Sequence, residues 1–266
     1  MVRLRNDMKK KFCLIGNGKM GSAFVNLIHK DFQMTVASPN TSPSYPCVFA
    51  NDISEIDECF DYITFAVKPM VLPQVLRNIR KTHYHEETRF ISLIAGAQSE
   101  VFRSSLGEQI KLTQIMTNLP VKIGKGIVAV YSDEKLNFLE KLGQVIYVPK
   151  EDDLNRFCAA VGSGSGFCYS IFEMYEEAVR KMGLGTEVDT RRLVLNLFQG
   201  SIDLLEESGL SFAEQKANVV TPNGTTHAGL QELTKSGSFV DAALDKALHR
   251  SRELGVLVSE ELKKQK

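Results

Sequence analysis

The chain has 266 residues, more than one typical domain needs, so we expect two domains. Hydrophobic residues make up 43% and charged residues 24%, as in an ordinary globular protein with a substantial core. Lys and Arg balance Asp and Glu at 32 each, which argues against nucleic acid as a partner, because polyanion-binding proteins normally carry a basic excess.

No apolar stretch approaches the roughly 20 residues that a bilayer span needs, so we predict no membrane association. The apolar run behind the basic N-terminus ends at Gly16, too short for a signal peptide, and we interpret it as a strand. The five cysteines form no CxxC pair and indicate reduced thiols. These features predict a cytoplasmic protein.

The five histidines suggest no metal site, and we expect His83 and His85 to lie in a solvated loop.

Short apolar runs separated by helix-like segments occupy the first half of the chain. They cover residues 12–15, 34–37, 62–67, 90–94 and 144–148. Runs that are apolar on both faces and alternate with helices are typical of a parallel sheet covered on both sides. We therefore predict an α/β fold, with a Rossmann-like, doubly wound, mostly parallel sheet over residues 1–150.

The pattern changes near Pro149, and from Glu151 onward only helical periodicity remains. We predict an all-α domain over residues 151–266. Its apolar stripes comprise Ile171, Met174, Tyr175, Ala178 and Met182, then Leu193, Leu197, Ile202 and Leu205, then Ala243, Ala247 and Leu254. Helices this apolar need more partners than so short a segment supplies. Either a second subunit covers these apolar stripes, or the helices bury them against one another in this chain's own bundle.

A glycine-rich motif follows the first predicted strand and opens a helix. Its G-x-G-x-x-G pattern is made by Gly16, Asn17, Gly18, Lys19, Met20 and Gly21. In this context the pattern predicts a dinucleotide site. The first glycine permits a tight turn, the second lets the backbone approach a pyrophosphate, and the third allows close packing of helix on strand. The alternative is a glycine-rich turn without a ligand.

The second strand is followed by no acidic residue between Ala37 and Ser42. An acid there would bind the ribose 2′-hydroxyl of NAD and repel the 2′-phosphate of NADP. The hydroxyl and amide groups present favour NADP, although no Arg is available to pair with the phosphate. NAD therefore stays possible as the cofactor.

Four further motifs follow along the chain. They are Phe65-Ala-Val-Lys-Pro69, Met116-Thr-Asn-Leu-Pro120, Ser163-Gly-Ser-Gly166 and Val220-Thr-Pro-Asn-Gly-Thr-Thr-His-Ala-Gly229. With the glycine loop, they make the chain resemble pyrroline-5-carboxylate reductase from Phe12 to about Leu254, in that family's order. The segment Thr-Pro-Asn-Gly-Thr-Thr at 221–226, followed by Ala-Gly-Leu, is the most specific of these motifs.

The resemblance implies an oxidoreductase that reduces 1-pyrroline-5-carboxylate to L-proline with NAD(P)H, the last step of proline biosynthesis. It implies a small-molecule substrate and a homodimer through the helical domain, with a larger ring of dimers as a further option. It places the pyrophosphate on residues 16–21 and the other cofactor contacts on Ser38, Asn51, Ala66, Val67, Lys68, Pro69, Ala95 and Gly96. It assigns the substrate to Asn218, Thr221, Gly224, Thr225 and Thr226, with Thr226 as the catalytic residue beside the ring nitrogen.

Three positions depart from the family's pattern: Thr117 and Phe167 stand where proline is usual, and Asn223 where glycine is commonest. Asn tolerates a left-handed backbone better than other non-glycine residues. If this segment binds no substrate, Thr221 or Thr225 would be an ordinary helix cap.

One alternative function is another nicotinamide reductase, such as a β-hydroxyacid dehydrogenase, although Lys181 lacks the pattern around that family's lysine. The other is a catalytically silent dinucleotide-binding protein.

Overall fold

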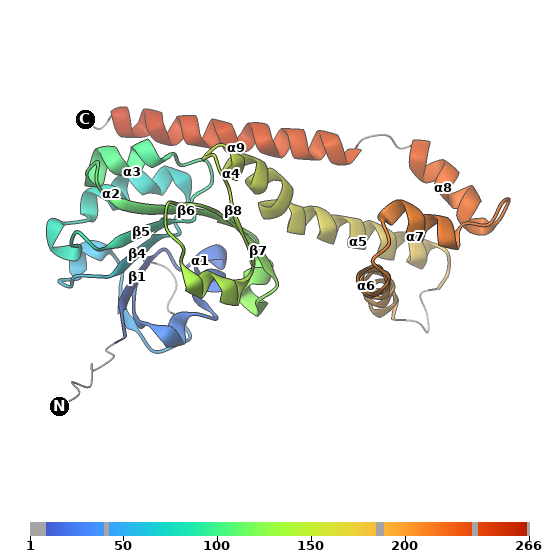
Figure 1. Cartoon of the computed structure of the whole chain (residues 1–266), viewed down its shortest axis with the longest axis horizontal. Coiled ribbons are helices and arrows are strands. Elements are labelled where there is room, and N and C mark those ends of the chain that lie inside the picture. Colours follow the sequence, from blue (N-terminus) through green and yellow to red (C-terminus); the bar gives the residue numbers. More distant parts are fainter. Residues whose placement is uncertain (1–8, 40–42, 185–188, 236–238, 265–266) are drawn as a thin grey trace. The chain divides into compact units, whose positions relative to one another are not determined.

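The structure, a computed structural model, describes residues 9–39, 43–184, 189–235 and 239–264 (Figure 1). The chain forms two compact units, which we call the sheet unit (Met1–Gly164 with Leu244–Lys266) and the helical unit (Ser165–Ala243). The last helix therefore contributes its first residues to the helical unit and the rest to the sheet unit. The predicted domain boundary at residue 150 stays a prediction.

Eight strands and nine α-helices are formed by the described residues. The strands are β1 (Lys11–Ile15), β2 (Gln33–Ala37), β3 (Val48–Ala50), β4 (Tyr62–Phe65), β5 (Arg89–Ser92), β6 (Lys111–Thr117), β7 (Gly126–Tyr131) and β8 (Gly143–Tyr147). The helices are α1 (Lys19–Val25), α2 (Leu72–Asn78), α3 (Ser99–Leu106), α4 (Asp153–Phe157), α5 (Gly164–Lys181), α6 (Thr190–Ser208), α7 (Phe212–Val219), α8 (Thr225–Lys235) and α9 (Phe239–Lys263).

All eight strands form one sheet in the order β3-β2-β1-β4-β5-β6-β7-β8. The strands from β3 to β6 are parallel, β7 runs antiparallel to β6, and β8 is parallel to β7. The chain order reverses between β1 and β4, which makes this the topological switch point where open α/β sheets bind ligands. The predicted doubly wound, mostly parallel sheet is confirmed.

The two faces of the sheet carry separate hydrophobic cores because side chains alternate along each strand. Phe12 and Leu14 of β1 pack on one face with Phe24 of α1 and with the short 3₁₀ turn η5 (Leu119–Ile123). Cys13 and Ile15 of the same strand join the opposite core, together with α2, α3 and the C-terminal part of α9. Figure 1 shows the sheet between α1 on one side and α2 and α3 on the other.

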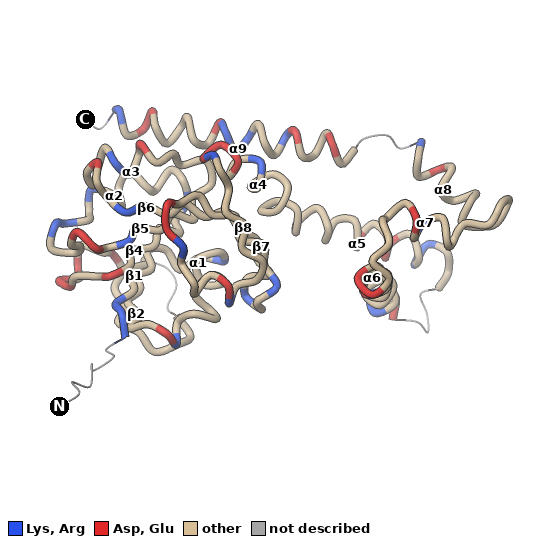
Figure 2. Tube along the Cα trace, in the orientation of Figure 1, with Lys and Arg blue, Asp and Glu red and all other residues tan. Residues whose placement is uncertain are grey.

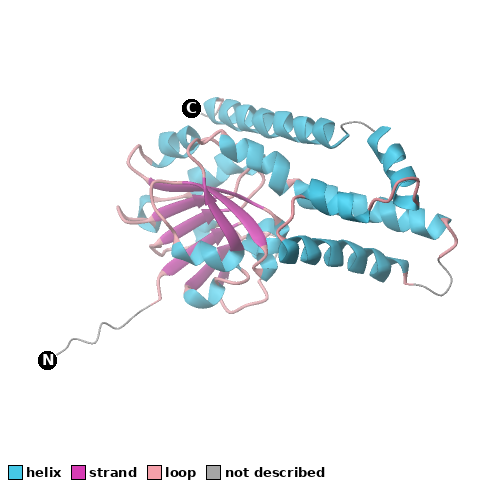
Figure 3. Cartoon of the chain, turned by 45° about the vertical axis from the view of Figure 1, so that its right-hand side comes forward, coloured by secondary structure: helices cyan, strands magenta, loops and turns pink. Residues whose placement is uncertain are grey.

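The helical unit contains no strand among its described residues (Figure 3). A π-helical turn, Cys158–Gly162, joins α4 to α5 at the border of the two units. Large apolar side chains of α5 and α6 stay exposed in the single chain, among them Tyr169, Met174, Leu197 and Ile202. Within the described ranges, no helix has both the length and the apolar character to cross a bilayer.

Two sequence expectations need correction. Strands β3, β6 and β7 were not predicted. β3 is a three-residue edge strand, and β6 carries polar residues in its interior, whereas β7 is a largely apolar run that was overlooked. His83 does not lie in a solvated loop: it is fully buried, and its Nδ1 accepts a hydrogen bond from the Arg80 backbone N–H at 3.0 Å. His85 is exposed, as expected.

Candidate cofactor and substrate sites

The glycine loop connects β1 to α1 at the carboxyl edge of the sheet. Gly16 adopts a φ of +96°, which favours glycine, and its N–H donates to the Ala37 carbonyl at the end of β2 (2.9 Å). A Cβ on Gly21 would stand 2.2 Å from the Gly16 oxygen, whereas a Cβ on Gly18 would meet nothing within 4 Å. The first and third glycines are therefore needed for packing, and the second leaves an open backbone surface.

The segment after β4 lies directly against this loop. The Ala66 N–H donates to the Ile15 carbonyl (2.8 Å), and a Cβ on Gly16 would stand 2.7 Å from the Ala66 oxygen. Lys68 is exposed and precedes a short 3₁₀ turn that begins at Pro69. The structure thus brings together the glycine loop and the 66–69 segment, the two predicted cofactor elements on either side of the switch point.

Ser38 and Asn51 follow the neighbouring strands β2 and β3 at the same edge. The buried Ser38 donates its N–H to the Ala50 carbonyl (2.9 Å), and the exposed Asn51 donates its N–H to a Glu55 carboxylate oxygen (3.2 Å). Residues 40–42 of the loop that favoured NADP lie outside the described residues. All cofactor residues expected from the sequence therefore follow parallel strands whose carboxyl ends share one edge of the sheet.

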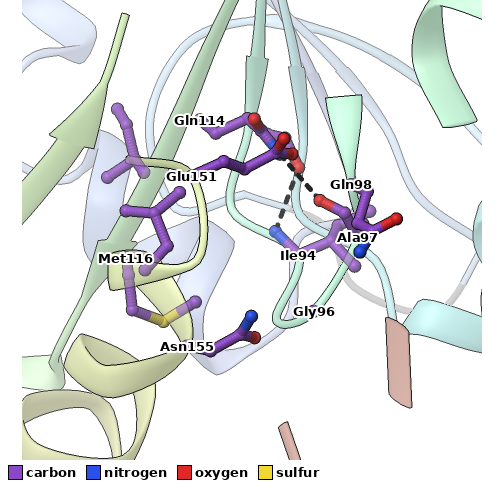
Figure 4. A pocket seen from close by; sticks show the side chains of 11 residues that line it. Ile94, Gly96, Ala97, Gln98, Gln114, Met116, Glu151 and Asn155 are labelled. Atoms are coloured by element: carbon purple, nitrogen blue, oxygen red, sulfur yellow. Dashed lines mark hydrogen bonds between the residues drawn. The ribbon is translucent and has the colours of Figure 1, made fainter. Parts of the chain in front are cut away.

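The turn after β5, which contains Ala95 and Gly96, is held by side chains that the sequence analysis missed (Figure 4). Gln114 of β6 donates from Nε2 to the Ala97 carbonyl at 2.7 Å, and this bond is buried. Glu151 accepts from the backbone N–H and the hydroxyl of Ser99, at 2.5 and 3.0 Å, and so caps α3 from outside the helix. A cavity of about 20 Å³ beside the turn has room for one water molecule.

A second missed contact comes from the far end of the sequence. Gly255 of α9 lies against Gly96, because a Cβ on Gly255 would stand 2.3 Å from the Gly96 oxygen. A glycine within a long helix is a sequence signal for close approach, since it weakens the helix by about 1 kcal/mol relative to alanine. The sequence offered no comparable signal for Gln114.

The predicted substrate segment connects α7 to α8 in the helical unit. The Gly224 N–H donates to the Thr221 carbonyl at 3.0 Å, which closes a turn, and Asn223 adopts a φ of 59°. Asn223 is the one described non-glycine residue with positive φ, so the replacement of glycine by asparagine keeps the left-handed backbone that the turn requires. A Cβ on Gly224 would stand 2.3 Å from the Thr221 hydroxyl oxygen, so a larger residue here would require the Thr221 side chain to move.

Helix α8 begins at Thr225, so Thr225 and Thr226 both lie in its first turn and are exposed. Backbone N–H groups in a helix's first turn have no intrahelical acceptor and suit an anion. His227 is half-buried, and its Nδ1 accepts from the Asn223 N–H at 3.2 Å. Asn218 is exposed near the end of α7. All five predicted substrate residues belong to the helical unit, whereas all predicted cofactor residues belong to the sheet unit.

The departures at Thr117 and Phe167 have different settings. Thr117 ends β6, is buried, and donates from its hydroxyl to the Ile127 carbonyl of β7 at 2.8 Å, a bond that proline could not make. Phe167 is half-buried in the first turn of α5. Lys181 is the lysine that would be catalytic if the chain were a β-hydroxyacid dehydrogenase. It is exposed and forms an ion pair with Glu177 at 2.7 Å.

All five cysteines are free, and Cys13 is buried as a small hydrophobic residue in the core of the sheet unit. Across the described residues, no cluster of three or more His, Cys, Asp or Glu side chains could hold a metal ion.

The switch-point loop, with one open and two tightly packed glycines, and the strand order define a Rossmann-type dinucleotide-binding protein with a helical second part. Residues 151–254 match the family model described as pyrroline-5-carboxylate reductase dimerisation. The chain is 32% identical over 205 residues to the pyrroline-5-carboxylate reductase of Staphylococcus aureus strain COL, which covers 73% of this chain and 74% of the relative. The chain belongs to the pyrroline-5-carboxylate reductase family.

Solved structures agree with this assignment. The crystal structure of Plasmodium falciparum pyrroline carboxylate reductase with NADP bound is 25% identical, covers 93% of this chain and 99% of its own, and superposes with a TM-score of 0.83. The enzyme from Streptococcus pyogenes, at 22% identity, covers 92% of this chain and 98% of its own with a TM-score of 0.79, which shows the same fold. The fold class and the family predicted from the sequence are confirmed.

Proposed function

We propose that the chain reduces 1-pyrroline-5-carboxylate to L-proline, with NADPH as the hydride donor. The observation that carries this proposal is membership of the family, established over about three quarters of the chain and of its relative. The reaction adds a hydride to the imine carbon and a proton to the ring nitrogen, so the C=N double bond becomes a single bond. When bound, the reduced nicotinamide supplies the hydride.

The glycine loop fits the pyrophosphate of such a cofactor. Gly18 exposes its backbone to open space, so a phosphate can approach it without meeting a side chain. Gly16 and Gly21 hold the loop in place by packing against Ala66 and against each other. We assign the pyrophosphate to residues 16–21, the ribose side to Ser38 and Asn51, and the nicotinamide side to residues 66–69 with Ala95 and Gly96.

The choice of NADPH over NADH rests on two observations. The described residues that follow β2, Ser38 and Pro39, carry no carboxylate that would repel a 2′-phosphate. The solved relative from Plasmodium falciparum holds NADP. NADH is the second cofactor to be tested, because we assign no Lys or Arg side chain among the described residues to the 2′-phosphate of NADPH.

We assign the substrate to the turn and first helical turn at residues 221–226, together with Asn218. Main-chain N–H groups at the start of α8 suit the substrate carboxylate, and the tight Thr221–Gly224 turn fixes their direction. The exposed Thr226 hydroxyl would donate a hydrogen bond to the ring nitrogen or accept one from its protonated form. A protonated imine is the better hydride acceptor because its carbon is more electrophilic, so holding that proton is the role we give Thr226.

The dimerisation model that matches residues 151–254 indicates a homo-oligomer. We propose a homodimer through the helical unit, in which α6 is central. Leu195 and Leu197 point to opposite sides of α6, yet they are 41% and 43% exposed in the single chain. The first half of α5 carries no charged residue (Figure 2). Apolar surface on this scale is typical of a buried interface. A ring of dimers and a cytoplasmic location stay predictions from the sequence.

Steady-state kinetics at the nicotinamide absorbance band test the proposed activity. Pyrroline-5-carboxylate should drive oxidation of NADPH, with a higher kcat/KM than for NADH, and a panel of β-hydroxyacids should not reduce NADP⁺. Turnover of a hydroxyacid would indicate the alternative dehydrogenase. Cofactor binding without any turnover would indicate a silent dinucleotide-binding protein and would contradict the proposal.

A further inference from the structure

The turn between β5 and α3, residues 93–98, is fixed by three elements of the sheet unit that are distant in sequence. These elements are β6 through Gln114, the loop before α4 through Glu151, which binds Ser99 at the start of α3, and α9 through Gly255. Ala95 and Gly96 of this turn are the residues we assign to the nicotinamide side of the cofactor. A shift of any of these three elements should therefore move the turn and, with it, the nicotinamide end of the cofactor.

The contact between α9 and the turn is backbone against backbone. A Cβ on Gly96, which has a φ of +74°, would stand 2.4 Å from the Ser251 carbonyl oxygen and 2.7 Å from the Gly255 nitrogen. In return, a Cβ on Gly255 would stand 2.3 Å from the Gly96 oxygen. Backbone atoms cannot rotate away as a flexible side chain would, so any side chain at Gly255 must displace either the helix or the turn.

The position of α9 is itself fixed on both sides of Gly255. The buried Ser251 hydroxyl donates to Asn155 Oδ1 at 2.7 Å, and Arg252 forms an ion pair with Asp152 at 2.7 Å. One turn further along the helix, Val258 is fully buried in the same core as Ile94 and Ala97. A side chain at Gly255 would therefore strain a contact in which both the helix and the turn are held, and any shift of the turn moves Ala95 and Gly96.

Gln114 holds the turn from the sheet side. Its side chain is buried within β6, and the orientation of its amide is set by the 2.7 Å bond from Nε2 to the Ala97 carbonyl (Figure 4). Gln114 and Gly255 therefore constrain the same turn from β6 and from α9.

We infer that Gly255 and Gln114 are positioning residues for the nicotinamide end of the cofactor, acting through the Ala95–Gly96 turn. The inference rests on the proposed function, since it takes the turn to lie beside the nicotinamide. Small displacements at a reacting centre cost far more in turnover than in binding, because hydride transfer needs close alignment of the two reacting carbons. The C-terminal helix thus acts on the reaction although it supplies none of the residues assigned to the site.

The test compares Gly255→Ala with Val256→Ala, a control on the neighbouring residue, which is 58% exposed. Each protein is assayed for kcat and for KM of NADPH with pyrroline-5-carboxylate. Each is also titrated with NADP⁺ and with 2′-phospho-ADP-ribose, which lacks only the nicotinamide ring. We expect Gly255→Ala to lower kcat about tenfold and to leave the Kd of 2′-phospho-ADP-ribose within about twofold of the wild type. The control should match the wild type in every measurement.

A merely structural role would give a different result. If Gly255→Ala lowered only the unfolding temperature, or weakened both nucleotides equally, the inference would be wrong. Should that variant fail to fold, Gln114→Met, which removes the bond to Ala97 without adding volume at the helix contact, must show the same loss of kcat with unchanged fragment binding. A wild type that neither binds NADP⁺ nor turns over would instead remove the proposed function itself. An active wild type with unaffected variants removes the inference alone.

Discussion

The carbonyl oxygen of Gly16 lies 2.2 Å from the point that a Cβ atom on Gly21 would occupy, so α1 packs on the end of β1 with no room for a side chain. We therefore predict that Gly21→Ala lowers the free energy of unfolding by about 1–3 kcal/mol, the usual cost of overpacking. Urea denaturation measures this change. Gly18→Ala is the control, because a Cβ there meets nothing within 4 Å. Equal stability of the two variants would contradict the packing described for the loop.

Gly18 tests the ligand rather than the fold. Its φ of −73° is open to any residue, so Gly18→Val should fold with an unfolding temperature close to that of the wild type. Its side chain would occupy the space that we assign to the pyrophosphate. We predict a Kd for NADPH at least about tenfold higher, or about 1.4 kcal/mol in binding free energy. Fluorescence titration measures it, and an unchanged Kd would show that the phosphates bind elsewhere.

Thr226 tests the role assigned to the substrate segment. Thr226→Ala should lower kcat about tenfold to a hundredfold, because a hydrogen bond to a charged nitrogen contributes about 1.5–3 kcal/mol. The secondary structure should be unchanged, since Thr226 is exposed in the first turn of α8. Thr234→Ala, on the same helix and bonded only within it, is the control. Full activity of Thr226→Ala would remove the residue from the mechanism.

His83 gives the sheet unit a pH-dependent stability. Burial lowers the pKa of His83 below its ordinary value of 6.5, an effect that the hydrogen bond to the Ile56 carbonyl opposes. Arg80 lowers the pKa further, and Asp57 and Asp52 raise it. Because the unfolded chain binds the proton at higher pH than the folded one, stability falls as the pH drops below 6.5, until it reaches the folded-state pKa.

Urea unfolding at pH 7.5 and pH 5.5 measures this loss. We predict that the wild type loses at most about 1.4 kcal/mol more than His83→Gln over this interval. The exposed His85→Gln should keep the wild-type pH dependence. Identical slopes for the wild type and His83→Gln would mean that the buried imidazole does not titrate as its surroundings indicate.

The elements that the sequence predicted correctly are those with a local signal. β1 is a continuous apolar run, and the glycines after it follow from the turn they make. β6 was not predicted, because its Thr113 and Gln114 look like surface residues. In the structure their partners, Ser132 and the Ala97 carbonyl, come from 19 and 17 residues away along the chain. Polar residues in a strand are compatible with burial when such partners exist, and no local pattern reports them.

The sequence also predicted those parts of the cofactor and substrate sites that have a local or family signal, and missed contacts between distant segments. The sequence led to Gly96 through the family resemblance, but not to Gly255. A glycine inside a helix indicates a close approach without identifying the partner, which here lies far away along the chain. For the apolar helices, the sequence left open whether a second subunit or the chain itself covers them. The exposure of Leu195, Leu197 and Ile202 in the single chain favours a second subunit.

The proposed interface gives a further prediction. Leu197→Glu should convert a dimer into a monomer in light scattering after size exclusion, because a charge in an apolar interface loses its hydration without gaining a partner. Leu197→Met keeps the apolar surface and should stay dimeric. A wild type that is monomeric at micromolar concentration, or a dimer indifferent to Leu197→Glu, would contradict an interface centred on α6.

Transfer of a labelled hydride tests the proposed activity most directly. The purified protein is incubated with pyrroline-5-carboxylate and NADPH carrying deuterium at the transferable position of nicotinamide C4, and the product is analysed by mass spectrometry and NMR. We predict L-proline with one deuterium on C5, the former imine carbon, in amounts equal to the NADPH oxidised. Proline without deuterium at C5, or NADPH oxidation without proline, would contradict the account.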